Sequence, residues 1–232
     1  SVDLIYGLPG QSEQSWNRQL ETILEQPIDH LSLYALEIPE RTDFGKRFAR
    51  GELDPLAEDA RATLFLATHE RLAAAGWDGY EVSNFARGPE HRSRHNLKYW
   101  RHVPFLGLGP SAHSLAVDPE EGLWRFWNEP LEPRWRRHLE AKSSAAAGWE
   151  RLPGTAIALE MAMLGLRTRE GLDLSRMLEM TGVDLVALNE ERLETWARRG
   201  WLRQGVEAGR SKILPTFEGM ARADRLASEL DF

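Results

Sequence analysis

The order of apolar and turn residues over the first 36 positions constrains the fold more than any other feature of the chain. Residues 2–6 are mostly apolar and predict a buried strand, and a Gly-Leu-Pro-Gly turn follows at residues 7–10. Ser12 can then cap a helix, which carries an apolar stripe made of Trp16, Leu20, Ile23 and Leu24. Residues 30–36 predict a second strand. This order predicts a βαβ unit with parallel strands, and therefore an α/β fold.

A second long helix and a further strand are expected after this unit. Asp54 is placed to cap the helix, with Pro55 at its first position and Gly76 just past its end. Residues 77–83 then predict a return of the chain to the sheet. Residues 84–115 are rich in Gly, Pro, His and Arg, and predict mainly loop.

The last third of the chain has a different character. A helix at 155–166 is followed by short helices that end at Gly200, two brief strands near 201–204 and 211–214, and a final helix from Thr216. This order predicts a small, mostly helical, winged-helix-like C-terminal domain. The segment Lys-Ser-Ser-Ala-Ala-Ala-Gly is the best linker candidate, so the predicted domains span 1–141 and 149–232.

Composition excludes several classes of protein. With 42% apolar and 28% charged residues, the chain has the composition of an ordinary globular protein, and no run approaches the roughly 20 apolar residues of a membrane span. It contains no cysteine, which excludes disulfides and cysteine-ligated iron–sulfur clusters within these residues. A cytoplasmic location fits this composition best. Because the chain opens directly in an apolar run with no approach segment, we expect a fragment or a processed chain.

Charge argues against nucleic acid as a partner. The whole chain carries −7, and residues 150–232 hold 12 Lys/Arg against 14 Asp/Glu. Phosphate contacts need a basic face, so the winged-helix-like tail is expected to pack against the rest of the chain rather than to bind DNA.

The richest candidate site is a basic segment at residues 87–102. It contains five Lys/Arg and one acid, for a formal charge of +4, together with three of the seven histidines. Cations can pair with carboxylates, Tyr99 and Trp100 can stack, and a neutral His can ligate iron, so the segment suits a planar anionic ligand. A solvated basic loop with two aromatic anchors is the alternative, and composition alone does not separate the two.

Two other segments carry weaker signals. Asp3 is an acid within an apolar strand next to the Gly-rich turn, where it either lines a ligand site at the strand end or caps a neighbouring loop. Residues 107–114 follow a tight Gly-Pro path that can bring Ser111 or His113 towards a pocket. No second histidine lies at metal-ligand spacing, so a structural role for His113 is equally compatible.

Four motifs occur in the order found in HemW-type proteins. They are Asp-Leu-Ile-Tyr-Gly-Leu-Pro-Gly-Gln at 3–11, Tyr-Glu-Val-Ser-Asn-Phe-Ala at 80–86, His-Asn-Leu-Lys-Tyr-Trp at 95–100, and Leu-Gly-Leu-Gly-Pro-Ser-Ala-His-Ser at 106–114. Residues 165–167, 171–174 and 214–219 are similar to the C-terminal domain of the same family. Across essentially its whole length, the chain resembles HemW-type heme chaperones, a radical-SAM family related to oxygen-independent coproporphyrinogen III oxidase.

The resemblance implies part of a (β/α)6 radical-SAM barrel followed by the small helical domain. It implies that Asp3, with Glu37 after the next strand, lines an S-adenosylmethionine site. It also implies that His95, Asn96, Tyr99 and Trp100 form the heme motif. In that motif His95 would ligate or orient the iron, the two aromatic rings would pack on the macrocycle, and Arg94 and Lys98 would hold the propionates.

The chain departs from the family at one point. The Cys-x-x-x-Cys-x-x-Cys motif that holds a [4Fe–4S] cluster and the Gly-rich S-adenosylmethionine motif are absent. The cluster and S-adenosylmethionine are therefore expected only in a longer parent chain, and this chain alone is predicted to be catalytically inactive.

Three functions follow as hypotheses. The leading one is heme binding and delivery to apo-proteins, including membrane-associated recipients. The second is oxygen-independent coproporphyrinogen III oxidase, against which the His-Asn-x-x-Tyr-Trp motif speaks. The third is a structural or interaction module without a cofactor.

Overall fold

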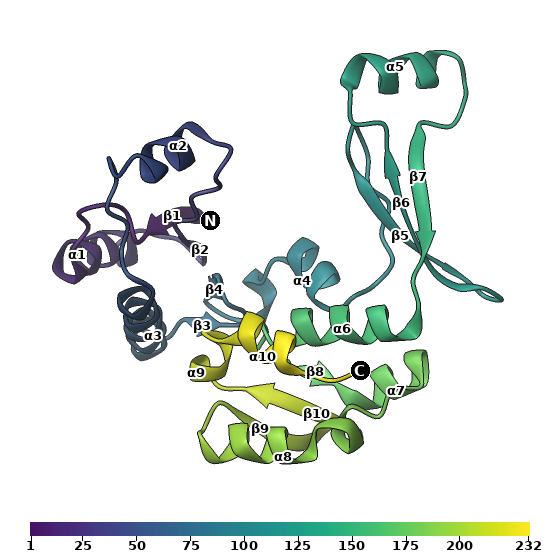
Figure 1. Cartoon of the computed structure of the whole chain (residues 1–232). Helices are drawn as coiled ribbons and strands as arrows, with labels where there is room; N and C mark the ends of the chain where they lie inside the picture. The colour runs from purple at the N-terminus through teal and green to yellow at the C-terminus, as the bar shows by residue number, and fades with distance from the viewer.

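The first sheet is built on one parallel strand pair, as the sequence predicts. The computed structural model describes residues 1–232, and in it β1 (Val2–Tyr6) lies parallel to β2 (His30–Ala35), with Val2 opposite Leu31 (Figure 1). Helix α1 (Glu13–Leu24) connects the two strands. Ser12 accepts a hydrogen bond from the Ser15 amide at 3.1 Å, which confirms the predicted cap.

The apolar stripe of α1 is buried against this sheet. Trp16 and Leu20 have no exposed surface and pack in a cluster of nine buried residues. The indole N–H of Trp16 donates to Thr68 Oγ1 at 2.8 Å, so its one polar group is satisfied inside the cluster. Burial of this stripe therefore fixes the helix on the sheet.

The sheet continues in the antiparallel sense. Strand β4 (Asn84–Ala86) pairs with β2, and β3 (Asp78–Gly79) pairs with β4, so the order is β1-β2-β4-β3. The predicted return to the sheet within 77–83 is therefore confirmed, but the strand there is limited to the two residues of β3. Glu81 forms a β-bridge with Thr168, and this contact with the C-terminal part draws the chain out of the sheet between β3 and β4.

Two helices lie between β2 and β3, and the sequence predicted only one. Helix α2 (Asp43–Ala49) begins after Thr42, whose side chain accepts from the Gly45 amide. Helix α3 (Glu58–Ala74) begins after Ala57, which makes no side-chain cap, so the predicted cap at Asp54 is wrong. The physical reason is that the segment before the helix is extended and packs Leu56 against the nine-residue cluster.

Residues 84–115 contain more regular structure than the predicted loop. Besides β4, they include a short 3₁₀ helix (Pro89–His91), helix α4 (Arg94–Trp100) and the start of β5. The prediction of mainly loop is wrong for these positions. Ser93 is the N-cap of α4, and a Ser before a helical turn is a signal that the basic composition of this segment obscures.

A three-stranded antiparallel sheet with one helix projects from the rest of the molecule, and we call residues 113–151 the arm (Figure 1). Its strands are β5 (His113–Asp118), β6 (Gly122–Asn128) and β7 (Ala146–Arg151), in that order across the sheet. Helix α5 (Glu132–Glu140) crosses its far end. Residues 146–148 of the linker candidate belong to β7, because their backbone pairs with β6.

The C-terminal part combines helices with a small antiparallel sheet. The helices are α6 (Gly154–Gly165), α7 (Leu174–Thr181), α8 (Leu185–Arg198), α9 (Phe217–Met220) and α10 (Ala223–Glu229). The strands are β8 (Leu172–Asp173), β9 (Leu202–Glu207) and β10 (Arg210–Pro215), in the order β8-β10-β9. The predicted helix before residue 166, the two brief strands and the final helix after Thr216 are confirmed.

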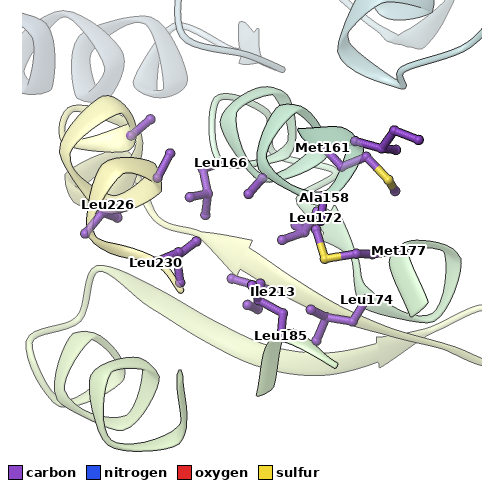
Figure 2. Packing of buried hydrophobic residues seen from close by; sticks show 14 of the residues in the cluster. Ala158, Met161, Leu166, Leu172, Leu174, Met177, Leu185, Ile213, Leu226 and Leu230 are labelled. Carbon is purple, nitrogen blue, oxygen red and sulfur yellow. The ribbon is translucent and has the colours of Figure 1, made fainter. Parts of the chain in front are cut away.

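The main core lies in this C-terminal part. A cluster of 20 buried residues joins α6, α7, α8, α10 and the small sheet, and Figure 2 shows Met161, Leu172, Met177 and Ile213 within it. Leu115, Leu123 and Leu152 of the arm and its exit belong to the same cluster. The root of the arm is therefore part of the core. None of the helices combines the length and the apolar character that a bilayer crossing needs.

His69 of α3 lies where the first sheet meets the C-terminal part. Its ring centroid is 4.6 Å from that of Phe85 in β4 and 4.5 Å from that of Phe217 in α9. Gly79 allows this packing, because a Cβ there would lie 2.8 Å from His69 Nδ1. Neither ring nitrogen has a hydrogen-bond partner, and burial lowers the pKa of His69 to about 4.

This pKa predicts a loss of stability in mild acid. The unfolded chain takes up the His69 proton near pH 6.5 and the folded chain only near pH 4, so the free energy of unfolding falls as the pH drops through this window. We expect His69→Leu to reduce that fall by about 3 kcal/mol, measured as the difference in urea unfolding between pH 7 and pH 4.

The control for this experiment is His138→Gln, at an exposed histidine of α5. It should unfold with the same pH dependence as the unmodified chain. An unchanged pH dependence in His69→Leu would contradict the assignment.

Candidate functional site

Helix α4 carries the histidine of the His-Asn-x-x-Tyr-Trp motif and lies on the first sheet. Leu97 is 8% exposed and packs with Tyr80 and Ala86 in a small apolar cluster. At the start of the helix, Ser93 Oγ accepts from the Asn96 amide at 3.3 Å. The helix is thus fixed by one buried leucine and one capping hydroxyl.

Tyr80 positions the N-terminus of α4 through its hydroxyl group. Its hydroxyl accepts the Ser93 amide at 3.1 Å and lies 2.8 Å from His30 Nε2 of β2. Arg92 pairs with Asp78 at 2.5 Å and lies over the Tyr80 ring. Burial raises the pKa of Tyr80, so the phenol stays protonated and its hydrogen bonds persist across the neutral range.

His95 and Tyr99 lie one turn apart on the exposed face of α4. Their ring centroids are 5.0 Å apart in an edge-on arrangement, and Tyr99 contacts Phe105 at 4.7 Å in the same manner. Tyr99 and Phe105 also line a cavity of about 180 Å³, whose wall has an apolar side formed with Val103, Leu115 and Leu164 and a polar side formed by His102, Arg125 and Glu160. An accessible imidazole therefore borders an aromatic and apolar surface.

Trp100 faces a different space. It lines a second cavity, of about 280 Å³, between α4 and the C-terminal part, and its indole nitrogen is buried without a hydrogen-bond partner. The structure therefore brings His95 and Tyr99 together but directs Trp100 elsewhere. The predicted packing of both aromatic rings on one macrocycle stays a prediction.

The other predicted residues are dispersed. Arg94 and Lys98 are exposed on α4 and form no ion pair, while Asn96 is half-buried. Asp3 is exposed on β1 opposite Ser32, and Glu37 is exposed two residues after β2. Outside this set, His113 stacks on Trp127 of the arm, with ring centroids 5.8 Å apart.

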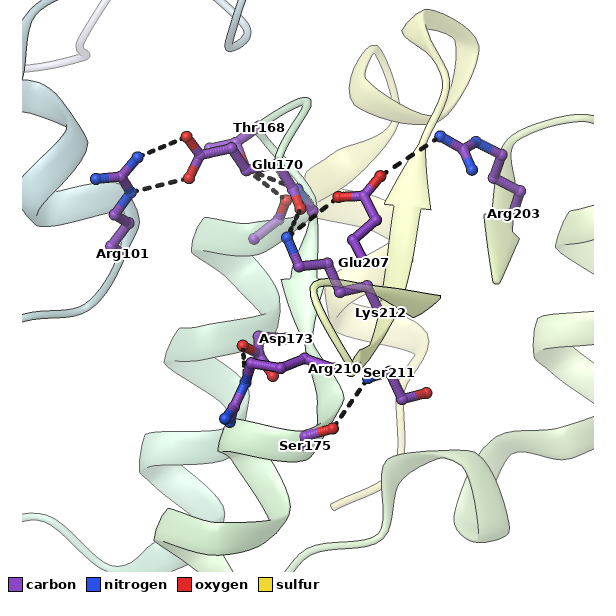
Figure 3. Close-up of polar contacts among 12 residues, drawn as sticks. Arg101, Thr168, Glu170, Asp173, Ser175, Arg203, Glu207, Arg210, Ser211 and Lys212 are labelled. Carbon is purple, nitrogen blue, oxygen red and sulfur yellow. Dashed lines mark hydrogen bonds and ion pairs between the residues drawn. The ribbon is translucent and has the colours of Figure 1, made fainter. Parts of the chain in front are cut away.

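Charged pairs fasten the C-terminal end of α4. Arg101 donates two hydrogen bonds to Glu170, at 2.9 and 2.6 Å, and the pair lowers the pKa of Glu170 (Figure 3). Lys212 of β10 donates to the Glu170 carbonyl at 3.2 Å and pairs with Glu207. These contacts join α4 to the small sheet of the C-terminal part.

Glu160 of α6 links His102, two residues after α4, to Arg125 of the arm. His102 is only 6% exposed, and its Nε2 lies 3.0 Å from Glu160 of α6, which also pairs with Arg125 of β6 at 2.5 Å. Burial opposes ionisation of Glu160, but the hydrogen bonds from His102 and Arg125 outweigh it and hold its pKa below the ordinary value. Glu160 is therefore a carboxylate at neutral pH.

The sequence did not identify Tyr80, Phe105, Arg125 or Glu160 as parts of this site. Glu160 lies 58 residues after His102, and no local pattern connects them. Of these four residues, only Tyr80 lies within one of the sequence motifs, at 80–86.

Comparisons with known proteins agree with the family resemblance. A model described as the HemN C-terminal domain matches residues 152–205. Heme chaperone HemW of Mycobacterium tuberculosis (strain CDC 1551 / Oshkosh) is 36% identical over 177 residues, which are 76% of this chain and 44% of that protein. Heme chaperone HemW of Synechocystis sp. is 32% identical over 202 residues, or 87% and 48% of the two chains. Radical S-adenosyl methionine domain-containing protein 1 of Danio rerio is 33% identical over 175 residues, or 74% and 39%.

One solved structure has the same fold. Coproporphyrinogen III oxidase (HemN) from Escherichia coli superposes with a TM-score of 0.67 over 97% of this chain and 53% of that one, at 19% identity. The chain is thus a mixed α/β protein with the fold of the C-terminal part of the HemN class. Within that class it belongs to the HemW-type radical-SAM family, and it spans about half or less of the length of the relatives it matches.

The Tyr80 hydroxyl allows a test of how α4 is held. We expect Tyr80→Phe to lower the free energy of unfolding by about 1–2 kcal/mol, because the Ser93 amide and His30 lose a buried partner. Urea unfolding of both chains measures this difference. Tyr34→Phe, at a ring that is 42% exposed, should change stability by less than about 0.5 kcal/mol. Equal effects of the two substitutions would show that the Tyr80 hydroxyl does not position the helix.

Proposed function

We propose that this chain carries the heme-binding face of a HemW-type heme chaperone, with His95 as the iron ligand. The observation that carries the proposal is the exposed His95–Tyr99 pair, whose rings are 5.0 Å apart beside a cavity that Tyr99 lines with Phe105 and other residues, apolar and charged. Relatives named heme chaperone cover 76% and 87% of the chain, which supports the same conclusion. In this proposal, heme is the cargo that the protein delivers to apo-proteins.

Each residue around His95 has a part in holding heme in this proposal. A neutral imidazole ligates heme iron, and Tyr99 and Phe105 offer ring edges and faces on which the macrocycle packs. Arg94 and Lys98 make no ion pair within the chain, so both are free to contact heme propionates, while Asn96 can orient the ligand.

The exposure of this face suits transfer. A site that enclosed heme would have to open before release, whereas His95 and Tyr99 are accessible, Tyr99 with 39% of its surface. A recipient apo-protein, including one at a membrane, can therefore approach the heme while it is still bound.

The second hypothesis, a coproporphyrinogen III oxidase, has less support. The HemN structure is only 19% identical and supports a common fold alone. Cluster ligation requires thiolates and the chain has no cysteine, so its residues do not fit a [4Fe–4S] cluster. We propose that the cluster and S-adenosylmethionine, for which Asp3 and Glu37 are candidate contacts, belong to a longer parent protein, and that this chain alone is inactive as an enzyme.

The domain assignment is part of the same proposal. Residues 1–141 would be the end of a (β/α)6 barrel together with the heme-motif segment, a view supported by the parallel β1–β2 pair. Residues 149–232 would form the winged-helix-like domain, a view supported by the family model at 152–205 and the small antiparallel sheet. We expect a cytoplasmic protein that does not bind nucleic acid.

A hemin titration tests the proposal directly. We expect the chain to shift the Soret band of hemin, and His95→Ala to weaken binding by about tenfold or more, because the iron loses its protein ligand. His91→Ala is the matched control, since His91 is an exposed histidine in the same basic segment. It should bind hemin like the unmodified chain.

Two outcomes would contradict this function. Equal hemin affinity in the unmodified chain and in His95→Ala would remove His95 as the ligand. No spectral change with any of the three chains would favour the cofactor-free interaction module.

A further inference from the structure

The cavity that Trp100 lines has features of a ligand site that the heme motif alone does not explain. It lies between the C-terminal end of α4 and elements α6, β8, α7 and β10, and has a volume of about 280 Å³. Its wall includes the cations Arg101, Arg176 and Lys212 and the acids Glu170 and Asp173. Cations therefore outnumber acids on this wall.

Two residues of this wall each carry a buried side-chain nitrogen that has no hydrogen-bond partner. They are Nε1 of Trp100, which can only donate, and Nδ1 of His102. Because Nε2 of His102 donates to Glu160 at 3.0 Å, Nδ1 of the neutral imidazole is an acceptor, so of the two nitrogens only the Trp100 indole can serve an anion. Leaving a buried polar group unpaired costs about 1–3 kcal/mol, so such groups in a native protein call for a partner. His102 also adopts a positive φ of 49°, a conformation that is costly for a residue with a side chain and that tends to occur at functional sites.

Arg176 is a guanidinium without a carboxylate partner. It donates to the carbonyl oxygens of Arg101 and His102, the second at 2.9 Å, and forms no ion pair. The acids nearby are already engaged, Asp173 with Arg210 at 2.6 Å and Glu170 with Arg101 at 2.6 Å. Burial lowers the pKa of Arg176, which means that its charge is only partly compensated by its surroundings.

We propose that this cavity is a carboxylate-binding subsite in which Arg176 donates to the ligand and the Trp100 ring turns so that its Nε1, buried in the empty cavity, donates beside it. The carboxylate is a propionate arm of the tetrapyrrole held at His95, a statement that rests on the proposed function. Val103 and His102 line both this cavity and the one beside Tyr99, so the two spaces are neighbours. The volume lies below the roughly 300–1,000 Å³ of pockets that enclose a drug-sized ligand, so one arm enters and the macrocycle stays outside.

This proposal gives Trp100 a role other than stacking. A carboxylate accepts from an indole N–H and a guanidinium together, and such charge-assisted bonds are about twice as strong as neutral ones. His95 would hold the iron on one face of α4, and Trp100 would hold a carboxylate at the end of the same helix.

The first experiment compares hemin with hemin dimethyl ester, in which both propionates are esterified. We expect Trp100→Phe and Arg176→Gln each to weaken hemin binding by about tenfold, and to change binding of the ester by less than about twofold. The matched controls are Trp149→Phe on the arm and Arg198→Gln on α8, because both residues are exposed and lie outside the cavity. These controls should bind both compounds like the unmodified chain.

The second experiment detects the subsite without hemin. The chain has nine tryptophans, and the loss of one indole N–H signal in Trp100→Phe identifies the Trp100 signal in a ¹H–¹⁵N spectrum. Sodium propionate should shift that signal in a saturable manner in the unmodified chain and not in Arg176→Gln. If Arg176→Gln does not fold, Trp100→Phe alone decides the hemin comparison. In the spectrum, Arg176→Lys then replaces Arg176→Gln. Because lysine keeps the charge without the planar guanidinium, sodium propionate should shift the Trp100 signal less in Arg176→Lys than in the unmodified chain.

The outcomes separate the two proposals. A shifted indole signal without any hemin binding would support the carboxylate subsite, assign it to a free carboxylate, and remove the proposed function. Loss of affinity for hemin but not for the ester supports the propionate. An indole signal that does not respond to propionate, together with equal losses for hemin and its ester, overturns the subsite.

Discussion

A helix of seven residues is not stable by itself in water, and the candidate site depends on one. Every turn of α4 is therefore held by something outside it. The Tyr80 hydroxyl and the Ser93 cap hold its beginning, the buried side chain of Leu97 holds its middle, and the Arg101–Glu170 pair holds its end. The partners come from the first sheet and from the C-terminal part, so the orientation of His95 is a property of the whole fold.

The sequence was most informative where structure is determined locally. The β1–α1–β2 unit, the Ser12 cap and the two strands of the C-terminal sheet follow from apolar periodicity and turn residues, and all of them were predicted. The start of α3 was misplaced because Leu56 is drawn into a core whose other members are distant in sequence. The break between β3 and β4 has the same origin, since Glu81 pairs with Thr168.

The candidate site, too, is predictable from the sequence only where the information is local. Its composition drew attention to residues 87–102, and the contiguous motif marked His95, Tyr99 and Trp100. The sequence does not predict which way each side chain of the motif points. One motif on one short helix serves two cavities. The partners that shape them, Phe105, Glu160 and Arg176, lie up to 76 residues after Trp100, the last residue of the motif. The missing information is tertiary, and no pattern within the motif contains it.

The arm is connected to the candidate site through its root. Its root is packed into the main core through Leu115 and Leu123, while α5 lies at the far end of the antiparallel sheet (Figure 1). Glu160 accepts from Arg125 in the arm and from His102 at the wall of both cavities. Because Arg125 of β6 and His102 share the Glu160 carboxylate, a displacement of β6 relative to α6 would change the geometry of the hydrogen bond between His102 and Glu160. The arm is therefore coupled to the wall of both cavities.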